Sequence, residues 1–123
     1  MFQIIITLTL SISAYTPQAN AISGGSVMAN GQAPHVGAFA CPSNIPLGSR
    51  VTILGAARDR AQRLGLPTDG VCADRFHGRY SRGHLDICIP RGYLELSNAE
   101  RLSLAREFGR VKGYVVITSN RSR

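Results

Sequence analysis

Apolar and polar residues alternate along residues 2–15, with one exception. The even positions carry apolar side chains from Phe2 to Ala14, and the odd positions carry Gln, Thr, Ser or Tyr except at Ile5. Side chains of a β-strand point alternately to the two faces of a sheet. The segment is therefore predicted to be a strand with one apolar face and one hydroxyl-rich face, and its Thr and Ile content agrees with this.

The same segment has a second interpretation as a secretory signal peptide. The apolar run is followed by Ala19-Asn20-Ala21, which has the small-residue pattern of a cleavage site. However, no charged residue precedes the run, and a signal peptide needs bulk hydrophobicity rather than alternation. The pattern favours the strand. Since Ser and Thr interrupt the run from Thr7 onward, we expect no transmembrane segment.

Further elements are predicted from short apolar runs bounded by Gly, Pro, Asn and Ser. The expected strands after the first are 37–42, 50–54, 69–76, 84–90 and 113–118. A helix is predicted at 56–65. Residues 17–37 are predicted to be a loop, and 119–123 a frayed tail.

The second helix has the clearest boundaries. Ser97 and Glu100 form a capping-box pattern, Leu102, Ala105 and Phe108 follow at helical spacing, and Gly109 ends the segment. With 123 residues, the chain is long enough for one domain. We therefore expect a single, mainly β domain over residues 1–123, with two short helices.

The composition narrows the range of partners. Lys and Arg total 14 against 7 Asp and Glu, which gives a net charge of +7. This charge suits an anionic partner such as the bacterial wall, or serves solubility alone. The basic residues are scattered and no zinc-knuckle spacing occurs, so no specific nucleic-acid partner is predicted.

Three cysteines are present, at positions 41, 72 and 88. None forms a Cys-x-x-Cys pair, which excludes a zinc ribbon or a thioredoxin-type motif. One bridge and one free thiol can be made in three ways. No metal or cofactor is predicted.

Asp74 and Asp86 stand out because each interrupts a strand of apolar or small residues. A half-buried carboxylate must be hydrogen-bonded, or is retained for acid chemistry. Two carboxylates near one cleft suggest glycoside cleavage. The alternative is that both accept hydrogen bonds from backbone amides of neighbouring loops. A basic loop lies between them, with Arg75, Arg79 and Arg82 at hand and His84 after it.

Five stretches together resemble the 3D domain, which is named for three aspartates. They are SAYTP (13–17), MANGQAPHVGAFACP (28–42), IPLGSRVTI (45–53), CADR (72–75) followed by GHLDICIP (83–90), and AREFGR (105–110). The resemblance covers residues 5–118. It implies a six-stranded double-psi β-barrel similar to those of membrane-bound lytic transglycosylase A and rare-lipoprotein-A-like proteins, and it makes AYTP part of a barrel strand.

The resemblance implies lytic cleavage of the β-1,4 bond between N-acetylmuramic acid and N-acetylglucosamine. Asp74 is expected to be the acid and base, with Asp86 supporting it. Arg75, Arg79, Arg82 and His84 are expected to contact the peptidoglycan strand.

The barrel also predicts a disulfide between Cys41 and Cys72, because both border one cleft. The rival pairing joins Cys72 to Cys88.

Two departures from the family pattern keep a second function open. Cys41 replaces the first aspartate of the name, and Arg75-Phe76 replaces a glycine pair after the second. The alternative is a non-catalytic structural or wall-binding barrel, for example a phage tail component that contacts other virion proteins. We expect a virion-associated, periplasmic or extracellular protein.

Overall fold

The computed structural model describes residues 2–17, 27–75 and 82–121. The chain order of the elements in these residues is β1 (Phe2–Tyr15), β2 (Ala38–Cys41), β3 (Arg50–Leu54), α1 (Ala56–Arg63), β4 (Asp69–Arg75), β5 (His84–Cys88), a 3-10 turn η1 (Tyr93–Glu95), α2 (Asn98–Phe108) and β6 (Val111–Arg121). The predicted N-terminal strand is thus present as β1.

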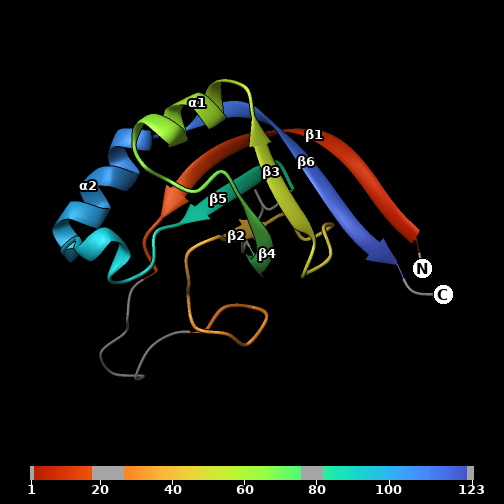
Figure 1. Cartoon of the computed structure of the whole chain (residues 1–123), viewed down its shortest axis with the longest axis horizontal. Helices are drawn as coiled ribbons and strands as arrows, with labels where there is room; N and C mark the ends of the chain where they lie inside the picture. The colour runs from red at the N-terminus through yellow and green to blue at the C-terminus, as the bar shows by residue number, and fades with distance from the viewer. Residues whose placement is uncertain (1, 18–26, 76–81, 122–123) are drawn as a thin grey trace.

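The six strands close into a barrel (Figure 1). They pair in the order β1-β5-β2-β4-β3-β6, and β6 pairs with β1. The β1–β5 and β2–β4 pairs are parallel, and the others are antiparallel. Raising each strand number by three, and returning to β1 after β6, maps the pairing pattern onto itself. Two parallel pairs related in this way and joined by β2–β5 form a double-psi β-barrel, as predicted.

The core fills the inside of the barrel with aliphatic and aromatic side chains. Every strand contributes to it, and so do both helices through Ala57, Ala61 and Phe108. A second, smaller cluster lies outside the barrel wall and consists of Met28, Ala38, Ala73 and Cys88, with Tyr15 and Val71 against it. The outer cluster packs the segment that begins at residue 27 against the sheet.

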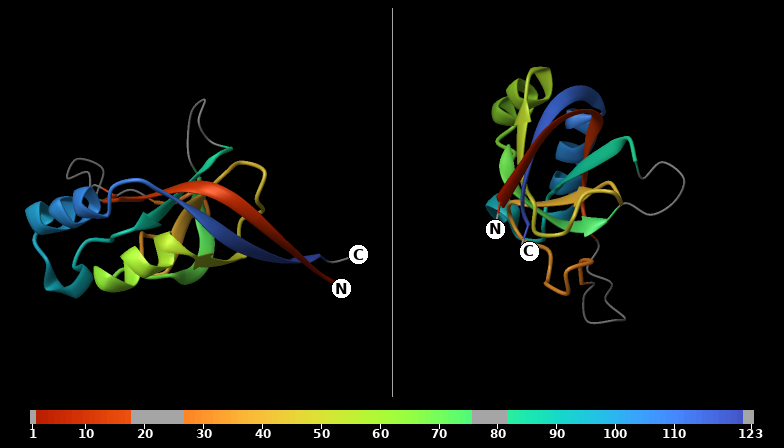
Figure 2. Two further views of the ribbon diagram at one scale, coloured as in Figure 1. Left: turned by 90° about the horizontal axis from the view of Figure 1, so that it is seen from above. Right: turned by 90° about the vertical axis from the view of Figure 1, so that its right-hand side faces the viewer.

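Both helices lie near one end of the barrel, and the first half of β1 extends with the end of β6 away from them (Figures 1 and 2). The strand ends are neighbours, since Phe2 pairs with Arg121. Strand β6 therefore continues beyond residue 118, and the prediction of a frayed tail was wrong for residues 119–121. Strand β1 supplies the pairing partners that hold these polar residues in the sheet.

Helix α2 begins as the sequence predicted. Ser97 Oγ accepts from the Glu100 amide at 3.1 Å, and Glu100 Oε1 accepts from the Ser97 amide at 2.8 Å, which completes the capping box.

The buried face of α2 includes Phe108 and, in part, Ala105, but not Leu102. Leu102 is exposed, whereas Arg101 is only 3% exposed and donates to Ile89 O at 2.7 Å and to Asn98 Oδ1 at 2.8 Å. Arg101 therefore ties the helix to the segment after β5. None of the helices in the described residues has the length and apolar character needed to cross a membrane.

Candidate functional site

Two carboxylates and a serine lie in one row across the barrel wall. Ala40 of β2 pairs with Asp74 of β4 on one side and with Asp86 of β5 on the other. Ser13 of β1 pairs with Asp86 in turn. Directly paired residues project from the same face of a sheet, and neighbouring strands are about 4.8 Å apart. The two aspartate Cα atoms are therefore about 10 Å apart, with the small side chain of Ala40 between them.

Regular alternation turns Asp86 away from the core. Its neighbours Leu85 and Ile87 are fully buried inside the barrel, so Asp86 lies on the outer face and is half-buried. This orientation follows from the apolar positions of β5 alone.

A β-bulge turns Asp74 to the same face. Cys72 lies in the inner core, so regular alternation would place Asp74 inside as well. However, the β2–β4 register passes from the pair Phe39–Cys72 to the pair Ala40–Asp74, and Ala73 is the extra residue. Bulges re-aim side chains in this way and are common beside functional sites. Because of it, Asp74 joins Asp86 outside.

Asp74 accepts three hydrogen bonds from residues that the structure describes. Its Oδ1 accepts from the backbone amides of Ala29 at 3.0 Å and Arg75 at 2.9 Å, and its Oδ2 accepts from Tyr15 Oη at 3.1 Å. The carboxylate thus joins β4 to β1 and to the turn at residue 29. In the described part of the chain it makes no ion pair, since the one salt bridge there joins Arg58 to Asp69.

Asp86 has a different environment. Ser13 Oγ donates to its Oδ1. Burial raises the pKa of Asp86, and the Ser13 hydrogen bond and the charges of His84 and Arg110 oppose this only in part. Burial therefore inclines the Asp86 carboxyl to keep a proton.

Tyr15 and Cys88 lie two residues beyond Ser13 and Asp86 along β1 and β5. They pair in register, and Tyr15 hydrogen-bonds both Cys88 and Asp74. Burial raises the pKa of Tyr15 strongly, and burial raises the pKa of the Cys88 thiol to about 11. Cys88 is the free cysteine and is buried, so the thiol is protonated and is a packing group rather than a nucleophile.

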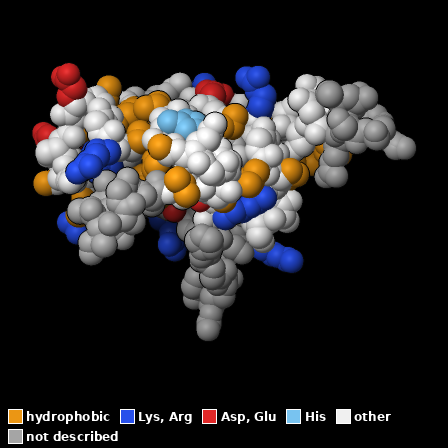
Figure 3. All heavy atoms as spheres, turned by 90° about the horizontal axis from the view of Figure 1, so that it is seen from below, with side chains coloured by type: hydrophobic (Ala, Val, Ile, Leu, Met, Phe, Trp, Pro, Cys, Tyr) orange, Lys and Arg blue, Asp and Glu red, His pale blue; other side chains and the backbone are white. Residues whose placement is uncertain are grey.

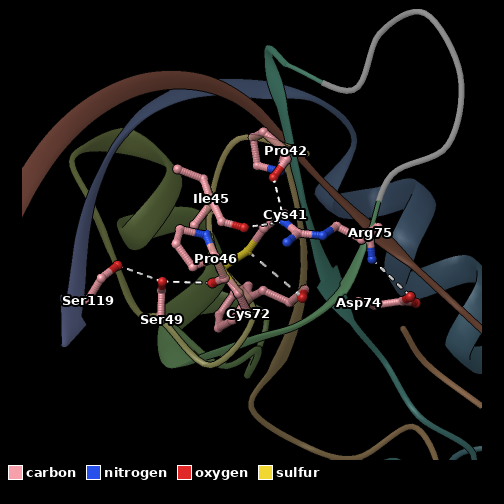
Figure 4. Close-up of a disulfide and its surroundings, with 10 residues drawn as sticks. Cys41, Pro42, Ile45, Pro46, Ser49, Cys72, Asp74, Arg75 and Ser119 are labelled. Carbon is pink, nitrogen blue, oxygen red and sulfur yellow. Dashed lines mark hydrogen bonds between the residues drawn. A yellow bond between two sulfur atoms is a disulfide. The ribbon is translucent and has the colours of Figure 1, made fainter. Parts of the chain in front are cut away.

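The predicted pair Cys41 and Cys72 forms the disulfide (Figure 4). Their Cα atoms are 5.7 Å apart, and the bridge joins β2 to β4 across the bulge, since Cys72 precedes the register change and Cys41 follows it. Both residues are buried in the inner core. The bridge therefore fixes the two strands at the point where the register changes.

Arg75 has a structural contact that the sequence did not reveal (Figure 4). Its pair in the register is Cys41, whose side chain faces inward. The Arg75 Nη1 donates to the carbonyl of Pro42 at 2.8 Å and also to the carbonyl of Ile45. The guanidinium holds the loop after β2 and does not pair with Asp74. Its predicted contact with a substrate stays a prediction.

Of the other residues predicted to contact a substrate, the structure describes His84 and Arg82 but not Arg79. His84 lies on the outer face two residues before Asp86 and is half-buried, and Arg82 is exposed. Arg79 lies outside the described residues. Among the residues that the structure describes, no group of His, Cys, Asp and Glu is arranged to hold a metal ion.

Models of known protein families and curated proteins were both compared with the sequence, and none matches. The resemblance to the 3D domain therefore stays a prediction that rests on the quoted motifs. The barrel connectivity, with its two parallel strand pairs, is compatible with it.

Sequence reasoning missed Ser13, Tyr15 and Ala29. Ser13 and Tyr15 belong to the hydroxyl-rich face of the alternating N-terminal segment, which was itself the available signal. The contact of Ala29 had no signal in the sequence, because it is made by a backbone amide, which every residue except proline has.

Proposed function

We propose that this chain is a peptidoglycan lytic transglycosylase that cleaves the β-1,4 bond between N-acetylmuramic acid and N-acetylglucosamine. The observation that carries the proposal is the pair of carboxyl groups in one outward row, held in unlike environments. Asymmetric carboxyl pairs are the usual means of providing a proton donor at neutral pH.

In this proposal Asp86 is the acid and base, and Asp74 is the supporting anion. This reverses the assignment expected from the resemblance. Burial raises the pKa of Asp86, which favours a carboxyl that still holds a proton. Asp74 accepts hydrogen bonds at both oxygens, which suits a fixed negative group better than a proton donor.

The reaction needs no external nucleophile. Asp86 gives its proton to the glycosidic oxygen as the C1–O bond breaks. The resulting carboxylate then takes the proton of the C6 hydroxyl, whose oxygen forms the new bond to C1 and closes a 1,6-anhydro ring. Ser13 positions the Asp86 carboxyl through its hydroxyl.

Two further observations support action outside the cytoplasm on an anionic wall. A buried disulfide is typical of oxidising compartments. The net charge is +7, and on the face shown in Figure 3 the Lys and Arg side chains are scattered rather than gathered into a stripe. A dispersed charge favours loose attraction to a polymer over docking to one nucleic-acid strand.

The alternative is a non-catalytic barrel with a structural or wall-binding role, such as a component of a phage tail. The observation that favours it is the hydrogen bonding of Asp74, whose oxygens join β1, β4 and the turn at Ala29. A carboxylate that serves only as a structural acceptor needs no substrate.

Digestion of purified sacculi separates these functions. Mass spectrometry should detect anhydromuropeptides with the wild type and none with Asp86→Asn, because an amide cannot give or take the proton. The loss should be about 10²–10⁴-fold or more. Asp74→Asn should lose less, and the exposed helix variant Asp59→Asn, with the same charge change, should be fully active. A wild type that binds sacculi without releasing anhydro products would support the structural barrel.

A further inference from the structure

Among the residues that the structure describes, strand β1 has a long unpaired edge. Residues 2–10 pair with β6 on one side, whereas β5 pairs only with residues 11–15 on the other. We call residues 2–10 of β1 the free edge, since within the described residues nothing pairs with it there. A row of unpaired backbone N–H and C=O groups is a template for another strand.

The free edge lacks the features that normally prevent pairing. The whole of β1 contains no charged residue and no proline, and its register with β6 runs without a bulge from Phe2 to Ile12. Edge strands of soluble proteins are usually protected by one of these devices.

The free edge also leaves apolar side chains in solvent. Ile4, Ile5 and Ile6 are 38%, 63% and 39% exposed. Ile4 and Ile6 share a face with the buried Leu10, so this face continues the barrel core beyond the point where the other strands cover it. Such a surface is suited to an apolar partner.

The sequence of the free edge is complementary to itself. In an antiparallel pair centred on Ile6, Ile6 faces its own copy and Ile4 faces Leu8. On the opposite face, Gln3 meets Thr9 and Ile5 meets Thr7. On the face of Ile6, apolar side chains therefore meet apolar ones. On the opposite face, Gln3 can hydrogen-bond with Thr9 and Ile5 lies against Thr7, and no like charges are opposed on either face.

We propose that two copies of this chain associate through their free edges, in antiparallel register about a two-fold axis. The barrel sheets then continue from one copy into the other across the paired β1 strands. Because the first half of β1 extends away from the helices (Figure 2), antiparallel pairing places the two barrel bodies at opposite ends of the shared ribbon. This separation limits repulsion between two chains of net charge +7.

Sedimentation velocity over increasing concentration tests the proposal. The wild type, with a chain mass of 13.2 kDa, should convert to a species of about twice that mass, and added salt should strengthen the association. The double variant Ile4→Lys/Ile6→Lys should stay monomeric, because like charges then meet across the axis.

The matched control is Leu94→Lys/Leu102→Lys, which adds the same charge at positions that are 65% and 42% exposed elsewhere. It should associate like the wild type, and equal loss in both variants would overturn the proposal. Hydrogen exchange on the wild type needs no variant: the amides of residues 2–10 that point away from β6 should gain protection as concentration rises.

A wild type that stays monomeric at every concentration would also overturn the proposal. A monomer that sediments with phospholipid vesicles would overturn it too, and would assign the free edge to a lipid surface.

Discussion

The Cys41–Cys72 bridge should be the largest single contribution to stability that can be removed without changing the sequence. It closes a loop with a sequence separation of 31, and the chain-entropy relation gives about 3.7 kcal/mol at 25 °C for that length. Unfolding entropy is about 2.1 cal/mol/K per residue, which gives about 260 cal/mol/K for 123 residues. Reduction should therefore lower Tm by about 14 °C.

The measurement is equilibrium unfolding in urea, followed by far-ultraviolet circular dichroism, with and without reductant. Both sulfurs are buried, so reductant must be added to the unfolded chain before refolding. The Cys88→Ala variant is the control, because without the third thiol no alternative bridge can form.

Two results would refute the reasoning. A stability difference below about 1 kcal/mol would show that the reduced unfolded chain retains structure near these strands. Peptide mapping that joins Cys72 to Cys88 would show that β2 and β4 are not held as described.

Three other outcomes are expected. Asp86→Asn should raise the stability of the protein at neutral pH. Because the pKa of Asp86 is raised in the folded state, Asp86 stabilises the fold below its unfolded-state pKa and loses this contribution as pH rises through the folded-state pKa. The thermal unfolding temperatures of variant and wild type should therefore converge in acid. Gly70→Ala should destabilise the protein strongly, because a Cβ there would lie 1.9 Å from the Gly37 carbonyl oxygen. The control Gly83→Ala meets nothing within 4 Å, so similar urea midpoints for the two variants would contradict the close approach. Cys88, with burial raising its pKa to about 11, should resist iodoacetamide at pH 8 in the native protein and react once unfolded; rapid native labelling by mass would contradict its burial.

Elements with a local signal were predictable from the sequence. The alternation of residues 2–15 located β1, and the Ser97–Glu100 capping box located the start of α2. The outward direction of Asp86 follows from the apolar residues on either side of it. In each case neighbouring residues carry the whole pattern, so no knowledge of distant segments is needed.

Features that depend on distant partners could not be predicted. The bulge at Ala73 is set by pairing with β2, and without it Asp74 would face the core. No local signal marked the contacts of Arg75 and Arg101, which both donate to carbonyls of segments that lie elsewhere in the sequence. An arginine can enter a protein interior where backbone carbonyls accept its N–H groups, and those carbonyls leave no mark on residue type.

The pairing of Phe2 with Arg121 has a consequence for the covalent chain. Two strand ends that face each other in antiparallel register can be joined by a two-residue Asn-Gly turn, which would make β6 and β1 a hairpin in a cyclic polypeptide. Cyclisation would restrict the unfolded chain, which should stabilise the folded barrel. It uses the edge of β1 that β6 already occupies, so a ring-closed protein should keep the same surface for a second copy. New ends could then be opened at an exposed turn such as the one at Gly92.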